Sequence, residues 1–249
     1  SVVQHARPVL LTMPSTIVPA AAGIYLAGDQ EVLVQSLAII PLGMLINGLF
    51  LAVWVLLPSH LDTAKSPLFI TTFTSLLVWF VFGIIMLFGV DFALDAGGTA
   101  FEIGILGLVL LIALAVGMNW RVHPTPKGKQ PVAGRVLFIR GSAAASAIGA
   151  AVWLSAQGQP LIAGLAAVFP AIFLTSMVAL WHAQGPTVPQ GAAGPMTMGG
   201  TSVAIYALVA MYSLSAWGVV FGSILAWSIA VFGWSLPAYF VLKRRITTD

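Results

Sequence analysis

Residues 38–57 read AIIPLGMLINGLFLAVWVLL, a run without a single charged side chain. A helix rises about 1.5 Å per residue, so a run of this length spans the roughly 30 Å hydrocarbon core of a bilayer. Soluble domains need a polar surface and carry about 25% charged residues. Here only 7% of the 249 residues are charged and 59% are hydrophobic. The run therefore predicts a membrane-spanning helix of an integral membrane protein.

Other apolar stretches of comparable length lie on both sides of this run. They predict an all-α, polytopic transmembrane bundle of about eight spans. None of them alternates apolar and polar residues as a barrel strand does. The predicted spans are residues 8–28, 32–57, 67–89, 102–120, 136–156, 160–182, 197–214 and 216–242.

The gap at residues 213–215 leaves an alternative, because without a turn there one long kinked helix would replace the last two spans. The whole chain, 1–249, is interpreted as a single membrane domain. Its N-terminal half is 1–120 and its C-terminal half is 136–249, and a basic loop at 121–135 joins them.

Charge is distributed unevenly over the predicted gaps. With eight spans, the basic residues fall on the side of the two termini or at its edge, and five acidic residues fall on the opposite side. Cytoplasmic loops are enriched in Lys and Arg, so both termini are predicted on the cytoplasmic, matrix or stromal side. The basic residues are Arg7, Lys65, Arg121, Lys127, Lys129, Arg135, Arg140, Lys243, Arg244 and Arg245, and the acidic ones are Asp29, Glu31, Asp91, Asp95 and Glu102.

Two short segments resemble each other across the halves. Residues 38–44 read AIIPLGM and residues 192–198 read AAGPMTM, and each follows a span that contains a proline, Pro14 or Pro170. The similarity relates spans 1–3 to spans 6–8 in opposite membrane orientation. Such inverted repeats are typical of secondary transporters, whose sites lie between the repeats near interrupted helices. Chance similarity among common membrane residues is the alternative.

The C-terminal half also resembles a known family. Residues 160–165 read PLIAGL and are followed by Phe169-Pro170, by a Gly-rich span and by a span that contains Trp. This pattern resembles the GlpM-type small integral membrane proteins over about 110 residues, residues 135–245. The resemblance implies a membrane-embedded helical unit, of which a duplicated and fused form is one interpretation. It brings no catalytic residue with it.

The side chains that carry most enzyme chemistry avoid the predicted span centres. No Asp, Glu or His lies there, and the chain has no cysteine. The sequence lacks the patterns that usually carry such chemistry: paired histidines for haem, a metal-binding pair, a Gly-rich phosphate loop and a Ser-His-Asp set. The sequence therefore predicts no enzyme, no cofactor and no metal site. Nucleic acid is excluded as a partner because the few basic residues sit beside apolar spans.

Partners are expected inside the membrane instead. The bilayer itself is one, and the basic residues Arg121, Arg135 and Arg140 are candidates for contact with anionic lipids or other anions. Snorkelling of these long side chains to the interface is the alternative. Membrane-protein partners or a second copy of the chain are also expected.

Polar and helix-breaking residues at membrane depth are the candidates for a solute pathway. Asn47 lies mid-span, where its amide needs a partner, either in a polar site or on a neighbouring helix. Residues 185–195 predict a Gly/Pro-rich connector, which is either a cytoplasmic loop or a segment that dips into the membrane. The candidate pathway residues are Pro14, Ser15, Pro41, Asn47, Pro170, Pro195, Thr201 and Ser202.

Two function classes follow from these observations. The first is a transporter or permease for a small solute, with its site between spans 1–2 and 6–7. The second is a non-catalytic accessory or scaffold subunit of a larger membrane complex. A transporter should bring the polar residues together at one cavity, whereas a scaffold should scatter them and present broad apolar faces.

Overall fold

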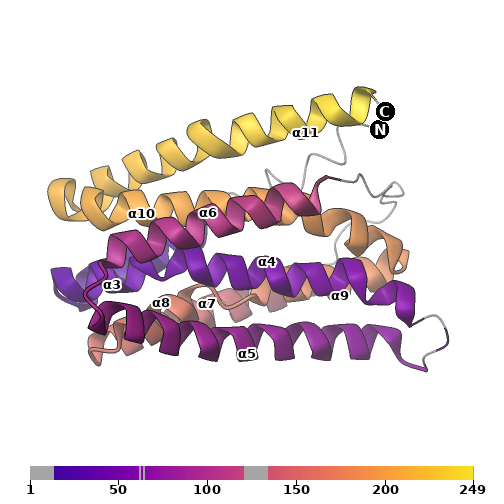
Figure 1. Ribbon diagram of the computed structural model, residues 1–249, viewed down its shortest axis with the longest axis horizontal. Helices are drawn as coiled ribbons and strands as arrows, with labels where there is room; N and C mark the ends of the chain where they lie inside the picture. The colour runs from indigo at the N-terminus through magenta and orange to yellow at the C-terminus, as the bar shows by residue number, and fades with distance from the viewer. Residues whose placement is uncertain (1–13, 62, 64, 121–133, 249) are drawn as a thin grey trace.

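The computed structural model describes residues 14–61, 63, 65–120 and 134–248. Within these ranges every regular element is a helix. The long helices lie side by side with nearly parallel axes in one bundle (Figure 1). Five helical segments are long and apolar enough to cross a bilayer, and two shorter apolar helices accompany them. The described chain has the architecture of an integral membrane protein.

Local sequence explains where several helices begin. Asp29 starts one helix by accepting a hydrogen bond from the Val32 N–H at 2.9 Å. Thr99 and Glu102 form a reciprocal capping box at the start of another. The helices are α2 (Ile17–Ala27), α3 (Gln30–Ala38), α4 (Ile40–Leu56), η1 (Pro58–His60), α5 (Pro67–Asp95), α6 (Ala100–Met118), α7 (Gly134–Ala156), α8 (Pro160–Ala167), α9 (Ala171–Gln184), α10 (Thr187–Ala230), η2 (Val231–Ser235) and α11 (Leu236–Thr248).

Two of the predicted spans are interrupted. The span predicted at 32–57 is α3 and α4, which meet at Ile39 just before Pro41. The span predicted at 160–182 is α8 and α9, separated by residues 168–170. Each interruption precedes or contains a proline, which has no N–H to continue the helical hydrogen bonds and disfavours helical geometry in the residue before it.

The predicted connector at residues 185–195 is wrong from Thr187 onward, because α10 begins there. Pro189 lies in the first turn, where a backbone N–H has no helical acceptor and its loss costs nothing. The small residues that read as a loop in the sequence are buried and let α10 pack closely on α4 and α6. Tertiary packing therefore overrides the turn-like composition of this segment.

The chain reverses direction inside the long helical segment that starts at Thr187. Gly218 has φ 72° and ψ 175°, a left-handed conformation that glycine adopts without steric cost. The Ser213 hydroxyl donates to the Gly222 carbonyl at 2.9 Å, so the two arms run back along each other. Figure 1 shows this reversal at the left end of α10. The turn expected at 213–215 therefore comes a few residues later.

A π-helical turn lies between the second arm of α10 and α11. Here the Leu236 N–H donates to the Val231 carbonyl. The cause is Pro237, which has no N–H and whose ring crowds the carbonyl four residues back. Widening the turn moves that carbonyl aside, and the helix continues as α11.

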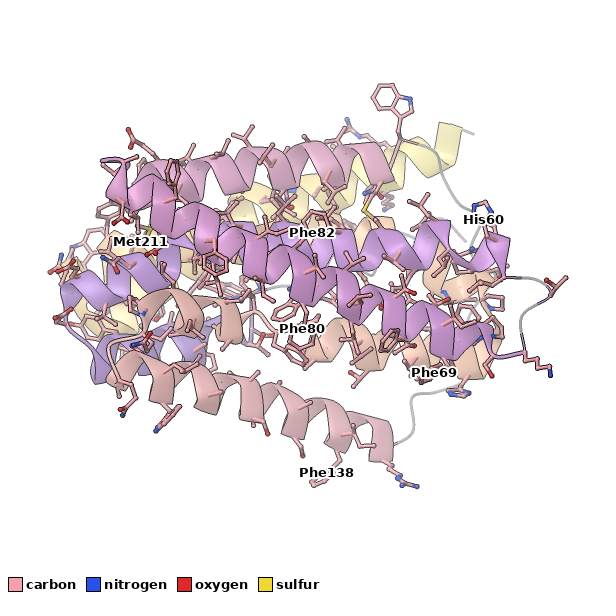
Figure 2. The ribbon with its side chains drawn as sticks, turned by 60° about the horizontal axis from the view of Figure 1, so that its bottom comes forward. His60, Phe69, Phe80, Phe82, Phe138 and Met211 are labelled. Atoms are coloured by element: carbon pink, nitrogen blue, oxygen red, sulfur yellow. The ribbon has the colours of Figure 1, made fainter. Side chains whose placement is uncertain are left out.

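The core lies around α4 and the first arm of α10, where Phe50, Trp54 and Tyr206 are fully buried. The bundle's outer surface is apolar too. Figure 2 shows Phe69, Phe80 and Phe82 along α5, and Phe138 pointing away from the bundle on α7. Phe138 is 75% exposed. An exposed apolar surface of this extent fits a lipid environment rather than water.

Candidate functional site

Asn47 joins three elements at the centre of the bundle. Its side chain is 2% exposed. The Nδ2 amide donates to the Val168 carbonyl at 2.8 Å and approaches the Met44 sulfur at 3.5 Å. The Oδ1 atom accepts a hydrogen bond from Trp79 Nε1 at 2.8 Å. We call Asn47, Trp79 and the Val168 carbonyl the Asn47 junction.

The interruption between α8 and α9 supplies the acceptor in this junction. Val168 ends α8 with non-helical backbone angles, so its carbonyl points out of the helical ladder. Gly43 on α4 allows the close approach, because a Cβ there would overlap the Val168 side chain. The Trp79 ring also packs edge-on against Phe169, with 5.2 Å between ring centroids. The result is a buried amide in contact with a helix break and two aromatic rings.

A second buried asparagine forms a similar arrangement near the other end of the bundle. Asn119 caps α6 and donates from Nδ2 to the Ala115 carbonyl at 2.7 Å and to the Gly194 carbonyl at 2.8 Å. Met198 lies four residues further along α10, and its carbonyl accepts a hydrogen bond from Trp234 Nε1 of η2 at 2.8 Å. We call Asn119, Trp234 and these α10 carbonyls the Asn119 junction.

Several predicted pathway residues lie near the Asn47 junction. Pro41 is buried at the start of α4, and Pro170 is buried in the α8–α9 break. A Cβ on Gly200 of α10 would lie 2.8 Å from the Met44 methyl carbon, so α10 faces the same part of α4. Thr201 and Ser202 beside it are buried and donate to carbonyls of their own helix.

Other predicted residues lie elsewhere or outside the described ranges. Pro195 belongs to the Asn119 junction, since it follows Gly194 directly. Pro14 is buried and Ser15 exposed just before α2, which packs on α3, α7 and α10. Among the candidates for anion contact, Arg135 is exposed. Arg121 and the side chain of Arg140 lie outside what the structure describes.

The buried polar side chains in the described ranges are hydroxyls and amides, without a charged group among them. Such groups recognise neutral donors and acceptors, and each buried one needs a partner. Across the described residues, no group of three or more His, Asp and Glu side chains gathers as metal ligands would. The central site therefore offers hydrogen bonds and aromatic surface.

The participants in the two junctions that are not among the predicted site residues are Trp79, Val168, Asn119, Trp234, Gly194 and Met198. Trp79 sits in the middle of its predicted span, whereas tryptophans usually anchor span ends, and that position is a usable signal. Asn119 is a polar residue at a span end and reads there as an interfacial residue. Val168 acts only through its backbone carbonyl, which leaves no trace in the sequence.

No family model, curated protein or solved structure matches the chain. The resemblance of residues 135–245 to the GlpM-type proteins therefore stays a prediction.

Proposed function

We propose that this chain is a membrane permease for a small uncharged solute, which passes at the Asn47 junction. The observation that carries the proposal is the contact between two interrupted helices. The Asn47 amide lies on α4, more than two turns after α3 and α4 meet at Ile39, and is bonded to the carbonyl of Val168 in the α8–α9 break. Transporter sites typically lie between interrupted helices, whose free backbone groups face the substrate.

The nature of the buried groups supports an uncharged solute. The described core presents amides, hydroxyls and carbonyls, and no ionised side chain that would pair with an ion. Burying a charge without a partner costs far more than burying a hydrogen-bonding neutral group. The Trp79 and Phe169 rings add an apolar wall next to the amide.

The number and direction of the passes belong to the same proposal. Of the five long candidate segments, the last doubles back at Gly218, and with the two shorter helices this gives eight passes. Both termini then face the cytoplasmic, matrix or stromal side. Arg121, Arg135 and Arg140 lie on that side, where they contact anionic lipid headgroups. The inverted repeat stays part of the proposal, although the two observed breaks fall in α3–α4 and α8–α9.

Solute flux into liposomes tests the proposal. The purified chain is reconstituted and mixed with urea, acetamide or erythritol, and shrinkage and reswelling are followed by light scattering. We expect faster entry of at least one of these uncharged probes than into protein-free liposomes. Asn47→Leu should change that rate severalfold, because it removes the central amide.

Asn119→Leu is the matched control. It removes the other buried amide, which contacts the continuous part of α10, and should leave the flux within about twofold of the unmodified protein. A flux equal to that of empty liposomes for every probe would overturn the proposal. So would equal effects of the two asparagine substitutions on a measured flux.

A second function is favoured by one specific observation, the broad apolar face along α5. Phe69, Phe73, Phe80, Phe88 and Phe92 are each more than half exposed there. Such a face would also suit an accessory subunit that packs against other membrane proteins. Gentle detergent extraction followed by native mass spectrometry separates the two functions. Reproducible co-purification with a larger complex favours the subunit, and a lone monomer or homodimer favours the permease.

A further inference from the structure

Helix α8 differs from the other bundle elements in how it is held. It has eight residues, Pro160–Ala167, and its sequence PLIAGLAA contains no polar side chain. At one end lies the turn at Gly158, whose φ of 68° lies in the left-handed region. At the other end lies the break at residues 168–170. Helix α8 is therefore not continuous with α7 or α9, and a short helix bounded by two non-helical segments can move as a rigid piece when those segments change their backbone angles.

The packing of α8 on the bundle is close but entirely apolar. Gly164 approaches α3 so tightly that a Cβ there would overlap the Ser36 carbonyl oxygen and the Ile39 side chain. In the part of the chain that the structure describes, the one side-chain hydrogen bond from another helix to α8 or its cap is that from Asn47 to the Val168 carbonyl. Trp79 holds Asn47 in place for that bond.

Helix α3, on which α8 packs, contains a buried polar side chain without a partner. The Ser36 hydroxyl is fully buried and makes no hydrogen bond with any described residue. An unpaired buried hydroxyl raises the free energy of the closed arrangement by about the cost of a lost hydrogen bond. Movement of α8 away from α3 would free the Asn47 amide and remove packing from the segment that carries Ser36.

We propose that α8 is the gate of the permease, that the Asn47 junction is its latch, and that the solute displaces the Val168 carbonyl. When α8 moves, the Asn47 Nδ2 amide loses its acceptor, so an incoming neutral solute with an acceptor oxygen takes that place. This inference rests on the proposed function and names its moving part and substrate class.

Thiol labelling tests the gate without measuring transport. The chain has no cysteine, so each engineered cysteine is the only thiol. Ile39→Cys places one directly under Gly164 of α8, where Ile39 is 1% exposed. Leu37→Cys is the matched control, because Leu37 is equally buried on the same helix but packs in the central core. A water-soluble methanethiosulfonate reagent is applied to reconstituted protein.

We expect Ile39→Cys to be labelled slowly and Leu37→Cys not at all. Loss of the two latch hydrogen bonds in Asn47→Leu should raise the labelling rate of Ile39→Cys about tenfold. Trp79→Phe removes one donor and keeps an aromatic ring, so about threefold is expected, and this variant keeps the test valid if Asn47→Leu does not fold. An Ile39→Cys labelling rate that neither Asn47→Leu nor Trp79→Phe raises would overturn the gate.

The labelling and flux experiments fail independently. If no probe crosses the membrane but the latch substitutions accelerate labelling, the permease is wrong and the movement of α8 stands. If a probe crosses and depends on Asn47 while Ile39→Cys stays unreactive in both latch variants, the permease stands and the gate is wrong.

Discussion

The Asn47 junction and the Asn119 junction contain the same types of residue, but the helix backbone differs between them. Each has a buried asparagine that donates to a carbonyl one or two residues before a proline, and each includes a tryptophan N–H donor. At Pro170 the helix is interrupted, whereas at Pro195 it continues. A proline in a membrane helix therefore does not decide by itself whether the helix breaks.

The difference lies in what surrounds the proline. Opposite Pro195, the carbonyl that loses its helical donor belongs to Gly191, a residue without a side chain to resist adjustment. Asn119 donates a hydrogen bond to the Gly194 carbonyl in the next turn of α10, which continues as a helix there. At Pro170 the break exposes the Val168 carbonyl, and Asn47 supplies its partner from another helix. The Asn119 junction stabilises a continuous helix, whereas the Asn47 junction connects α4 to the break between two helices.

The largest expected difference concerns two glycines, one in α8 beside the Asn47 junction and one in the Asn119 junction. Gly164→Ala forces a Cβ into the Ser36 carbonyl, so we expect a loss of about 3 kcal/mol in the free energy of unfolding. Gly194→Ala would place its Cβ 2.9 Å from the Asn119 Oδ1 atom and 3.0 Å from the Met118 carbonyl oxygen. This overlap is milder than that at Gly164, so a loss of about 1 kcal/mol is expected. Unfolding in mixed micelles measures both values.

Gly149→Ala serves as the control for that pair, because no atom lies within 4 Å of its Cβ position. It should leave stability unchanged or raise it by up to about 1 kcal/mol, as alanine favours the helix. A larger loss of unfolding free energy in Gly194→Ala than in Gly164→Ala would contradict this prediction, because the region of the α8–α9 break would then tolerate the added methyl group better.

The asparagines should differ by a smaller amount. Asn47→Leu removes two hydrogen bonds to other helices, and Asn119→Leu removes one. Hydrogen bonds between membrane helices contribute about 0.6 kcal/mol on average. We therefore expect Asn47→Leu to lower the free energy of unfolding by about 1 to 2 kcal/mol and Asn119→Leu by roughly half of that. Equal losses in the same unfolding assay would contradict the distinction drawn here.

The prolines should show the smallest effects, with opposite signs. Pro195→Ala gives Gly191 a helical donor again, so a gain of about 0.5 to 1 kcal/mol is expected. Pro170→Ala loosens a backbone that proline presets in the break, so a loss of about 0.5 kcal/mol is expected. Hydrogen exchange checks the local origin. Protection should rise around Gly191 in the first variant and fall around residues 168–172 in the second.

The sequence predicts the helical membrane character well, because hydropathy and charge act locally. Asp29 and the Thr99–Glu102 capping box mark helix starts that can be recognised from residue type alone. Residues 187–195 show the limit of such reasoning. Their glycines and prolines favour a turn, and only packing on α4 and α6 makes them helical.

The candidate site was predictable only in part. Asn47 stands out as a mid-span amide, and of the two partners predicted for it, the structure has the one on neighbouring helices. The identity of that partner depends on Val168, which is 121 residues away in the chain. No periodicity or composition relates two such positions. The sequence likewise predicts the reversal at residues 213–215, whereas it occurs at Gly218, because serines and a glycine that all favour a turn lie within a few residues of each other.

That reversal also bears on how the chain is made. No charged residue lies between Thr187 and Leu242, so the ribosome delivers both arms before Lys243, Arg244 and Arg245 emerge. At roughly 5 to 20 residues per second, this takes several seconds. Until then the segment itself carries no charged side chain. The bonds from Ser213 to Gly222 and from Tyr206 to Ser223 join the two arms in the folded chain, so we expect the arms to enter the bilayer together as one hairpin.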